Sequence, residues 1–404
     1  MIISLPQACA VVDGCVRPRA AVRCSLADAA ELVLATPVMA DRDLPPSHRS
    51  AMDGYAFLRG DAPATPRCLD VRGEIPAGVC PAFALRPSEC ARIFTGACIP
   101  EGADTVVMQE DTADAGENRV RLQTVPARGA NILRQGENAR QGAELLQPGA
   151  VLSPVQIGLC AAAGCASLDV IPRPRIAVLT TGEELLDVSA AAAAHQTRDS
   201  NGPMISALLQ AARFDPGAVR RARDSEEAVA EAVTSLLAAA DVLLITGGVS
   251  VGKYDFVPRA LQRLGAIVQL HGVAVRPGKP QLVATLGADK YIFGLPGNPL
   301  SVMVGLLEFV LPALRKLSGF GPADCRPGLR AKAVEAIRGR KGQHHLLPAH
   351  LAWTSTGPEA RLIAGHGSAD LVSAGRASGF VVVPPDALVA PGEWLDFRTW
   401  EPMA

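Results

Sequence analysis

The sequence has few aromatic residues and almost no excess of charge. Phe, Trp and Tyr make up 4% of its 404 residues, and 39 Lys and Arg against 40 Asp and Glu leave a formal net charge of -1. Nucleic-acid binding draws on basic surfaces and on rings that stack on bases, and this composition favours neither. We therefore expect no nucleic-acid partner.

Motifs for zinc and for dinucleotides are also missing. The ten cysteines include no C-x-x-C pair, and no H-x-x-x-H completes a zinc site, so we expect reduced, mostly buried thiols. No G-x-G-x-x-G turn follows the first strand of the α/β pattern described below, which argues against an NAD-dependent enzyme.

Nor does the sequence carry a clear targeting or membrane segment. The first fifteen residues lack a basic region and include Asp13, which is unfavourable for a signal peptide. The apolar stretch 230–249 contains Glu231 and Asp241, so it is a poor membrane span. We expect a cytoplasmic protein with no membrane partner.

The length predicts two to four domains, and the middle of the chain has an α/β pattern. From residue 170 to about 319, β-rich runs ("RIAVLTTG", "DVLLITGG", "YIFGLPG") alternate with helical runs that begin near Ser200 and at Ser225. This alternation predicts a mostly parallel sheet with helices on both faces.

The flanking regions are β-rich. Residues 50–137 predict a small antiparallel β domain, and residues 324–404 predict a small barrel or sandwich. We expect a helical opening segment, at about 4–40, and a helix near 155 to flank the first β domain and to pack together.

Three glycine-bearing loops follow strands of the α/β pattern, at 180–184, 246–255 and 294–301. Ligands of an open parallel sheet bind outside the carboxyl ends of its strands. One such loop alone is more often a plain turn, but three at one edge favour a ligand site. The candidate ligand-binding residues of the second loop are Gly247, Gly248, Ser250 and Lys253, whose backbone N–H groups and charge suit a phosphate-like anion.

The third loop, "GLPGNPLS", predicts a rigid anion cradle. Pro296 and Pro299 fix φ, glycines including Gly297 permit close approach or positive φ, and Asn298 can bond backbone or ligand. Arg276 and Lys279 in "RPGKP" add positive charge for an oxyanion.

Carboxylates accompany these loops: Glu184, Asp224 and Asp255. Two carboxylates about 5 Å apart repel by roughly 3 kcal/mol at an effective dielectric constant of 20, and a cation relieves this repulsion. Oxygen ligands beside an oxyanion favour Mg²⁺. The alternative for Asp224 is a helix N-cap.

Six motifs in collinear order resemble the MoeA family, the molybdopterin molybdenumtransferases that include the gephyrin E domain. They are "SAMDGYA", "RIFTGACIPEGADTVVMQE", "TGEEL", "TGGVSVGKYDF", "RPGKP" and "GLPGNPLS". The resemblance covers nearly the whole chain and implies a multidomain α/β plus β fold. In it, residues 1–47 and 138–172 form an elongated N-terminal linker domain, with a β domain inserted at 48–137. Residues 173–323 form a doubly wound, MogA/MoaB-like molybdopterin-binding domain, and 324–404 form a C-terminal β-barrel.

The resemblance also implies the reaction, which is Mg²⁺-dependent insertion of molybdate into adenylylated molybdopterin with release of AMP. It implies a homodimer whose active cleft combines the β domain of one copy with the α/β domain of the other. Molybdopterin adenylyltransferase and recipient molybdoenzymes are the implied partners. By motif, Asp53 and Thr95 face the cleft, and Glu184, Asp224 and Asp255 position Mg²⁺ or the attacking groups. Lys279 holds the anion, and Ser373 of the last domain reaches the cleft.

The chain departs from the family pattern at four places. Leu133 stands for an Arg, Asn138 for an Asp and Arg276 for a Lys, and an Arg expected near Pro348 is missing. The candidates to compensate are Arg134, or His344 and His345. Two alternatives therefore stay open: a non-catalytic or specialised paralogue that acts as a molybdopterin-binding scaffold or chaperone, and a molybdopterin adenylyltransferase.

Overall fold

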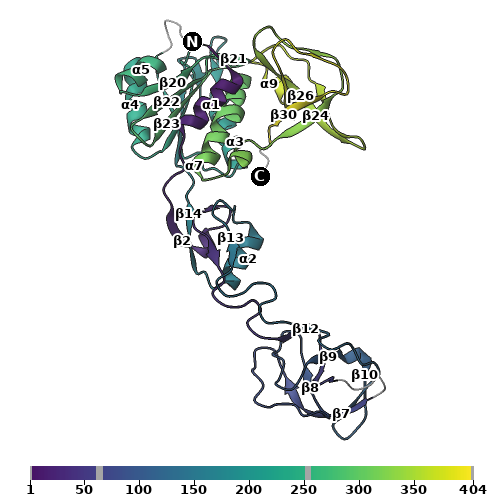
Figure 1. The fold of residues 1–404 in the computed structure, drawn as a ribbon. Coiled ribbons are helices and arrows are strands. Elements are labelled where there is room, and N and C mark those ends of the chain that lie inside the picture. The colour runs from purple at the N-terminus through teal and green to yellow at the C-terminus, as the bar shows by residue number, and fades with distance from the viewer. Residues whose placement is uncertain (1, 61–66, 251–255, 402–404) are drawn as a thin grey trace. The chain divides into compact units, whose positions relative to one another are not determined.

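A computed structural model describes residues 2–60, 67–250 and 256–401 (Figure 1). Lys253 and Asp255 of the predicted site lie outside these residues. The chain forms two compact units, one of Met1–Val22 with Asp169–Ala404 and one of Arg23–Leu168. It passes between them twice, in β2 (Val22–Ser25) and in β14 (Ser167–Ile171).

The first unit contains a six-stranded sheet in the order β18-β15-β19-β23-β22-β20. β15 pairs in parallel with β18 and β19, and β19 with β23, whereas β22 pairs antiparallel with both β23 and β20, so only β22 is reversed and the predicted, mostly parallel sheet is confirmed. The strands span Ala218–Ala222 (β18), Ile176–Thr181 (β15), Val242–Thr246 (β19), Lys290–Leu295 (β23), Leu282–Leu286 (β22) and Ile267–His271 (β20).

Helices cover both faces of this sheet, as predicted (Figure 1). Alternate residues of one strand enter different cores: Leu244 of β19 joins the core beneath one set of helices, and Ile245 joins the other. Strands buried on both faces are therefore apolar along their whole length. The helices are α4 (Glu226–Leu237) and α5 (Val257–Arg263) on one face, and α1 (Leu5–Cys15), α3 (Asn201–Ala211), α6 (Pro299–Gly305), η3 (Leu306–Val310) and α7 (Leu311–Leu317) on the other.

The two predicted helix starts differ in their caps. The Ser225 hydroxyl accepts from the N–H of Ala228 and caps α4, as expected. At α3, Ser200 makes no side-chain cap bond, and the Asp199 carboxylate instead accepts from the N–H of Gly202 at 3.0 Å.

The expected helical segment at 4–40 is wrong beyond Cys15. Pro18 disfavours a helical conformation of Arg17, and the backbone is already extended at Val16. The following segment forms β2, η1 (Leu26–Asp28), β3 (Val33–Leu34) and β4 (Val38–Met39). α1 also packs elsewhere than predicted: Ala8 and Val12 are fully buried in the α/β core, so residues 1–22 belong with that unit rather than with 23–47.

The C-terminal region of the first unit is a five-stranded closed barrel, which decides between the two predicted β architectures. β26, β27, β24, β30 and β28 pair in that order, and β26 also pairs with β28. They span His344–Thr354 (β26), Gly357–Leu362 (β27), Leu329–Ala333 (β24), Trp394–Thr399 (β30) and Gly379–Val383 (β28).

Backbone pairing and a buried ion pair join the barrel to the α/β part. β21 (Val273–Arg276) pairs with β26 on one side and β1 (Ile3–Ser4) on the other. The Glu308 carboxylate, 2% exposed within η3, accepts from Arg398 of β30 at 2.7 Å. The remaining elements of this unit are β16 (Leu185–Leu186), β17 (Thr197–Arg198), β25 (Ile337–Arg338), β29 (Leu388–Val389), α8 (Pro322–Cys325) and α9 (Leu371–Ala374).

The second unit contains the predicted β domain, with a sheet in the order β10-β11-β7-β8-β6-β9. Its pairings are antiparallel except for β7 with β8, which is parallel. The strands span Thr112–Asp114, Arg119–Leu122, Arg67–Ile75, Glu89–Ile93, Gly54–Phe57 and Thr105–Met108, in sheet order. The unit also contains η2 (Gln109–Asp111), α2 (Pro154–Ala162) and the short pairs β5 (Arg49–Ser50) with β12 (Ile132–Leu133) and β4 with β13 (Glu144–Leu146).

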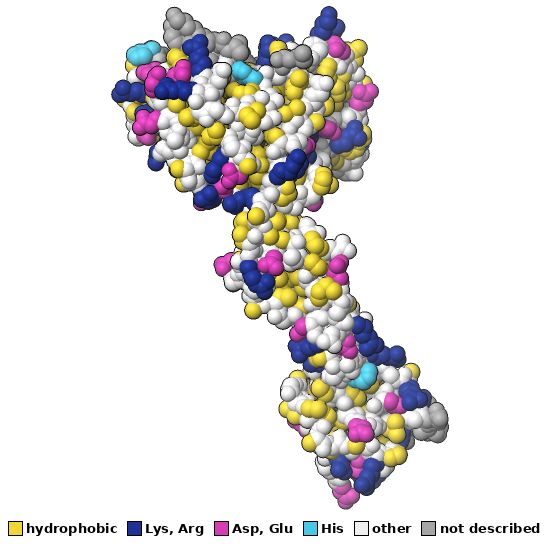
Figure 2. Space-filling model, turned by 60° about the vertical axis from the view of Figure 1, so that its left-hand side comes forward, with side chains coloured by type: hydrophobic (Ala, Val, Ile, Leu, Met, Phe, Trp, Pro, Cys, Tyr) yellow, Lys and Arg dark blue, Asp and Glu magenta, His cyan; other side chains and the backbone are white. Residues whose placement is uncertain are grey.

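The surface has no single dominant charge on the face that Figure 2 shows, where Lys and Arg are interspersed with Asp and Glu. Among the described residues, no helix is both long and apolar enough to cross a membrane. All ten cysteines are free; Cys90, Cys160 and Cys325 are buried, whereas Cys68 and Cys80 are exposed, so the expectation of mostly buried thiols holds only in part.

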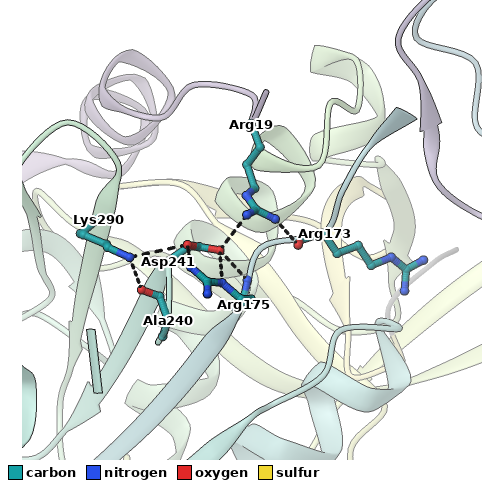
Figure 3. A network of polar contacts seen from close by, with 6 residues as sticks. All are labelled: Arg19, Arg173, Arg175, Ala240, Asp241 and Lys290. Atoms are coloured by element: carbon teal, nitrogen blue, oxygen red, sulfur yellow. Dashed lines mark hydrogen bonds and ion pairs between the residues drawn. The ribbon is translucent and has the colours of Figure 1, made fainter. Parts of the chain in front are cut away.

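One buried carboxylate organises the amino-terminal edge of the parallel sheet (Figure 3). Asp241, just ahead of β19, accepts from the backbone N–H of Arg175 at 2.9 Å and from its guanidinium at 2.8 Å. Arg19 lies 3.2 Å from the same carboxylate, and Lys290 lies 3.7 Å away. Burial alone would raise the pKa of Asp241, but the hydrogen bonds from Arg175 and the charge of Arg19 lower it to about 2. This network fastens the N-terminal segment to the sheet.

We predict that Asp241→Asn lowers the free energy of unfolding by about 2 kcal/mol at pH 7, because the charged carboxylate is the favoured form in the folded state. Since the folded-state pKa is depressed, this contribution is fully present above pH 4 and is lost as the pH falls towards about 2. Urea unfolding at pH 7, 5, 4 and 3 measures it. Asp289→Asn, at an exposed neighbouring site, is the control. The prediction is contradicted if the difference in free energy of unfolding between wild type and Asp241→Asn does not decrease below pH 4.

Candidate functional site

The three glycine-bearing loops meet at the carboxyl edge of the sheet. Strand register places Thr180 of β15 opposite Thr246 of β19, and Thr246 opposite Leu295 of β23. The N–H of Gly247 then donates to the Leu295 carbonyl at 3.1 Å. The expectation that these loops share one edge is therefore confirmed for their described residues.

Asn201, at the start of α3, ties two of the loops together. Its amide nitrogen donates to the Thr246 hydroxyl at 3.0 Å and to the Gly297 carbonyl at 2.7 Å. Thr246 in turn donates to the Pro296 carbonyl at 3.1 Å. Sequence reasoning used Asn201 only as part of a helix start, since nothing local in the sequence indicates that its side chain reaches residues 45 and 96 positions away.

The glycines of these loops have different roles. Gly247 has φ of +93°, and a Cβ there would lie 2.3 Å from the Thr181 carbonyl oxygen, so only glycine fits. Gly294 also lacks room, because a Cβ would approach Val249 to 2.9 Å. Gly297 does not have a positive φ, and a Cβ there would meet no protein atom closer than 3.9 Å, so of the two predicted reasons for glycine only the close approach of a ligand stays a prediction.

Two of the three predicted metal-binding carboxylates lie in the described part of this edge. Thr181 pairs with Ala222 at the ends of β15 and β18, and Glu184 and Asp224 follow within three residues of that pair. A Cβ on Gly248 would lie 3.4 Å from Asp224 Oδ1, so Asp224 borders the second loop. Ser225, not Asp224, caps α4, which removes the N-cap alternative.

The carboxylate oxygens of Glu184 and Asp224 suit a divalent cation, but these two residues alone do not make a complete metal site. Among the described residues, no group of three or more His, Cys, Asp or Glu is arranged to hold a metal, and Asp255 lies outside them. Glu184 is exposed and Asp224 is half-buried, and both supply only the oxygen atoms that Mg²⁺ prefers.

Beside this edge, a cavity of about 690 Å³ opens between the α/β part and the barrel of the same unit. Five predicted substrate-binding residues line it: Arg276, Lys279, Pro296, Asn298 and Ser373. Gly297 and Pro299 belong to the same loop but are not among the lining residues, and Gly247, Gly248 and Ser250 lie on the neighbouring loop.

The barrel contributes lining residues beyond these five, and among them only His345 was a candidate from the sequence, as compensation for the Arg missing near Pro348. Arg340, His345 and His366 all line the cavity. Together with Arg276 and Lys279, Arg340 makes three permanently positive side chains, and no Asp or Glu occurs among the described lining residues. This arrangement favours an anion of more than one negative charge.

Hydrogen bonds fix the walls of the cavity. The Asn298 amide donates to the Ser368 hydroxyl at 2.9 Å, and the N–H of Leu300 donates to the Ser368 carbonyl at 3.0 Å. Gln281, 1% exposed, donates to the Ser301 carbonyl at 2.9 Å and holds the "RPGKP" turn against α6. Asn298 therefore bonds a barrel loop, rather than its own neighbouring backbone.

Ser373 is 6% exposed, and its hydroxyl donates to the Asp370 carbonyl at 3.1 Å. The Asp370 carboxylate accepts from the backbone N–H groups of His366 and Ser373, which lowers its pKa. Asp370 thus stabilises the loop that presents His366 and Ser368 to the cavity.

The other unit holds the remaining predicted pair, Asp53 and Thr95, and brings the two together. The backbone N–H and the hydroxyl of Thr95 both donate to Asp53 Oδ1 at 2.8 Å. These two bonds, the backbone one first, lower the pKa of Asp53. Leu133 and Asn138, which depart from the family pattern, are both exposed in this unit, and the Asn138 backbone N–H donates to the Leu44 carbonyl.

Comparison with known proteins connects these features to one family. Residues 3–164 match the family model for the MoeA N-terminal region (domain I and II), and residues 177–316 match that for a probable molybdopterin binding domain. A molybdopterin molybdenumtransferase from Nostoc sp. is 40% identical over 294 residues, which are 71% of this chain and 67% of that protein. The chain belongs to the MoeA family.

Other relatives agree with this membership. The Bacillus subtilis molybdopterin molybdenumtransferase is 37% identical over 298 residues, covering 72% of this chain and 69% of its own length. The crystal structure of a MoeA protein from Pyrococcus horikosii matches with a TM-score of 0.81 and 26% identity, covering 100% of both chains. The multidomain α/β plus β fold expected from the MoeA resemblance is therefore confirmed.

We predict that Asn201→Ala destabilises the first unit by about 2 kcal/mol, because its hydrogen bonds to the Gly297 carbonyl and to the buried Thr246 hydroxyl are both lost. Urea unfolding measures this change, and hydrogen exchange should show faster exchange at Gly247. Ser206→Ala, which removes only a hydroxyl bonded to the preceding turn of α3, is the matched control. Equal stability of the two variants would contradict the role of Asn201.

We also predict that Thr95→Val raises the pKa of Asp53 towards its ordinary value, since one of its two hydrogen bonds is lost while the backbone bond remains. A carboxyl ¹³C NMR titration of Asp53 measures the shift. Thr124→Val, at an exposed position of the same unit, should leave this pKa unchanged. An unaltered Asp53 titration in Thr95→Val would refute the prediction.

Proposed function

We propose that this MoeA-family chain is a molybdopterin molybdenumtransferase of molybdenum cofactor biosynthesis, which inserts molybdate into adenylylated molybdopterin and releases AMP. The observation that carries this proposal is the cavity lined by Arg276, Lys279 and Arg340, without a carboxylate among its described lining residues. Molybdate is a tetrahedral dianion, and such a cavity offsets its charge. The names and identities of the relatives support the same reaction.

In this proposal, each part of the site has a separate task. Arg276 and Lys279 hold the oxyanion, and the second loop brings the backbone N–H of Gly248 close to the phosphate of the nucleotide, whereas the N–H of Gly247 bonds Leu295. Glu184 and Asp224, with Asp255, hold Mg²⁺, which when bound neutralises charge on the phosphate that leaves. Pro296 and Pro299 keep the third loop rigid, so that little ordering is required when the substrate binds.

The active protein in this proposal is a homodimer in which Asp53 and Thr95 of one copy serve the α/β domain of the other. The Asp53 carboxylate is held charged and oriented by Thr95, as a group that binds or positions a substrate should be. An adenylyltransferase that supplies the substrate and a recipient molybdoenzyme are the further partners.

We predict that purified protein with adenylylated molybdopterin, Mg²⁺ and molybdate releases AMP in a molybdate-dependent reaction. Lys279→Ala should raise the KM for molybdate about 30-fold, which corresponds to the loss of a charge-assisted hydrogen bond of about 2 kcal/mol. Lys332→Ala, whose ammonium lies over the Trp394 ring of the barrel, is the control. Tight binding of the pterin without turnover would instead identify a scaffold, and adenylylation of free molybdopterin with ATP would identify an adenylyltransferase.

Mixing two inactive variants tests the shared cleft. If Asp53 acts on a partner's Asp224, random dimers of Asp53→Ala and Asp224→Ala recover about a quarter of wild-type AMP release, because half the dimers are mixed and each has one intact site. No recovery in dimers shown to be mixed would place both residues in the same copy's site.

A further inference from the structure

The residue pairing between β21 and β26 places a histidine side chain beside Arg276. These strands run parallel, and Arg276 stands opposite His345. Opposite residues of paired strands project from the same face of a sheet. Both residues line the cavity, as does Arg340 from the turn before β26.

His345 has a hydrogen-bonding atom without a protein partner. Its Nδ1 is buried and makes no hydrogen bond to the described residues. The ring as a whole is only partly buried and borders the cavity, so a ligand there can contact it. Burial, followed by the charges of Arg340 and Arg276, lowers the pKa of His345 to about 4, so the ring is neutral at pH 7 and has one N–H to donate.

We propose that His345 donates a hydrogen bond directly to the oxyanion in this cavity and is the barrel's ligand-selecting residue in this chain. This inference rests on the proposed function and assigns a residue within the same site. A neutral imidazole donates one bond and adds no charge, whereas an arginine at this position would add a charge and two parallel bonds. The anion is thus held by the charges of Arg276, Lys279 and Arg340 and oriented by His345.

Binding of sodium molybdate to the full-length chain, measured by calorimetry, tests this role. His345→Ala should weaken binding about tenfold, the size expected for one hydrogen bond to a charged group, and His345→Gln, which retains an amide N–H donor, should remain within about threefold of wild type. His350→Ala is the matched control, because His350 lies exposed on the same strand and bonds Ser378 instead. Thermal unfolding of each variant reports whether it is folded.

Histidine ring signals in a ¹³C-histidine-labelled protein add a measurement that a purely structural role would not affect. The signal that disappears in His345→Gln should shift as molybdate is added to wild type, while that of His350 should not. A folded His345→Ala variant that binds molybdate as wild type does would overturn the proposal. Weaker binding by His345→Ala would also overturn it if the His345 ring signal of wild type did not shift on adding molybdate. If His345→Ala does not fold, the shift of this wild-type signal alone tests the proposal.

The failure of this inference is distinguishable from that of the proposed function. If wild type fails to bind molybdate and to release AMP, the function itself is wrong. If wild type does both and His345→Ala does so equally, only the role of His345 is wrong.

Discussion

The burial of both faces of the parallel sheet is the constraint on which the first unit depends. Because neighbouring residues such as Leu244 and Ile245 enter opposite cores, the central strands β15, β19 and β23 are apolar between their ends. In these three strands, polar side chains are confined to the strand ends. At the amino edge, Asp241 forms ion pairs with Arg19, Arg175 and Lys290, and this network stabilises the fold (Figure 3). At the carboxyl edge, the loops leave a cavity whose positive charge has no carboxylate among its described lining residues.

This cavity depends on the contact between the α/β part and the barrel. β21 belongs to the chain segment of the α/β part but pairs with β26 of the barrel, and Asn298 bonds Ser368 across the same boundary. The ion pair between Glu308 of η3 and Arg398 of β30 also joins the helices of the α/β part to the barrel. Positive side chains from both parts thus face one space, and the rigidity of their strands and turns reduces the ordering that an anion must impose.

Sequence reasoning succeeded where a signal is local or periodic. Alternation of β-rich and helical runs predicted the α/β sheet, and Ser225 followed by acidic residues predicted the start of α4. It failed for the opening segment, where a helical pattern continues past Cys15 but Pro18 and tertiary pairing end the helix. It also misjudged Ser200, because the neighbouring Asp199 carboxylate reaches the free N–H of Gly202. Only this second error concerns competition between adjacent residues that have similar local preferences.

The sequence by itself determined the apolar strands, the glycine and proline loops, the order of motifs that indicated the MoeA family, and five of the residues that line the cavity. Only the tertiary structure decided which side chains share a space: that Asn201 reaches Gly297, that residues 1–22 join the α/β core, and that Arg276 stands opposite His345. The physical reason is that strand register and helix packing set these contacts. They depend on the whole buried surface rather than on any short stretch of chain.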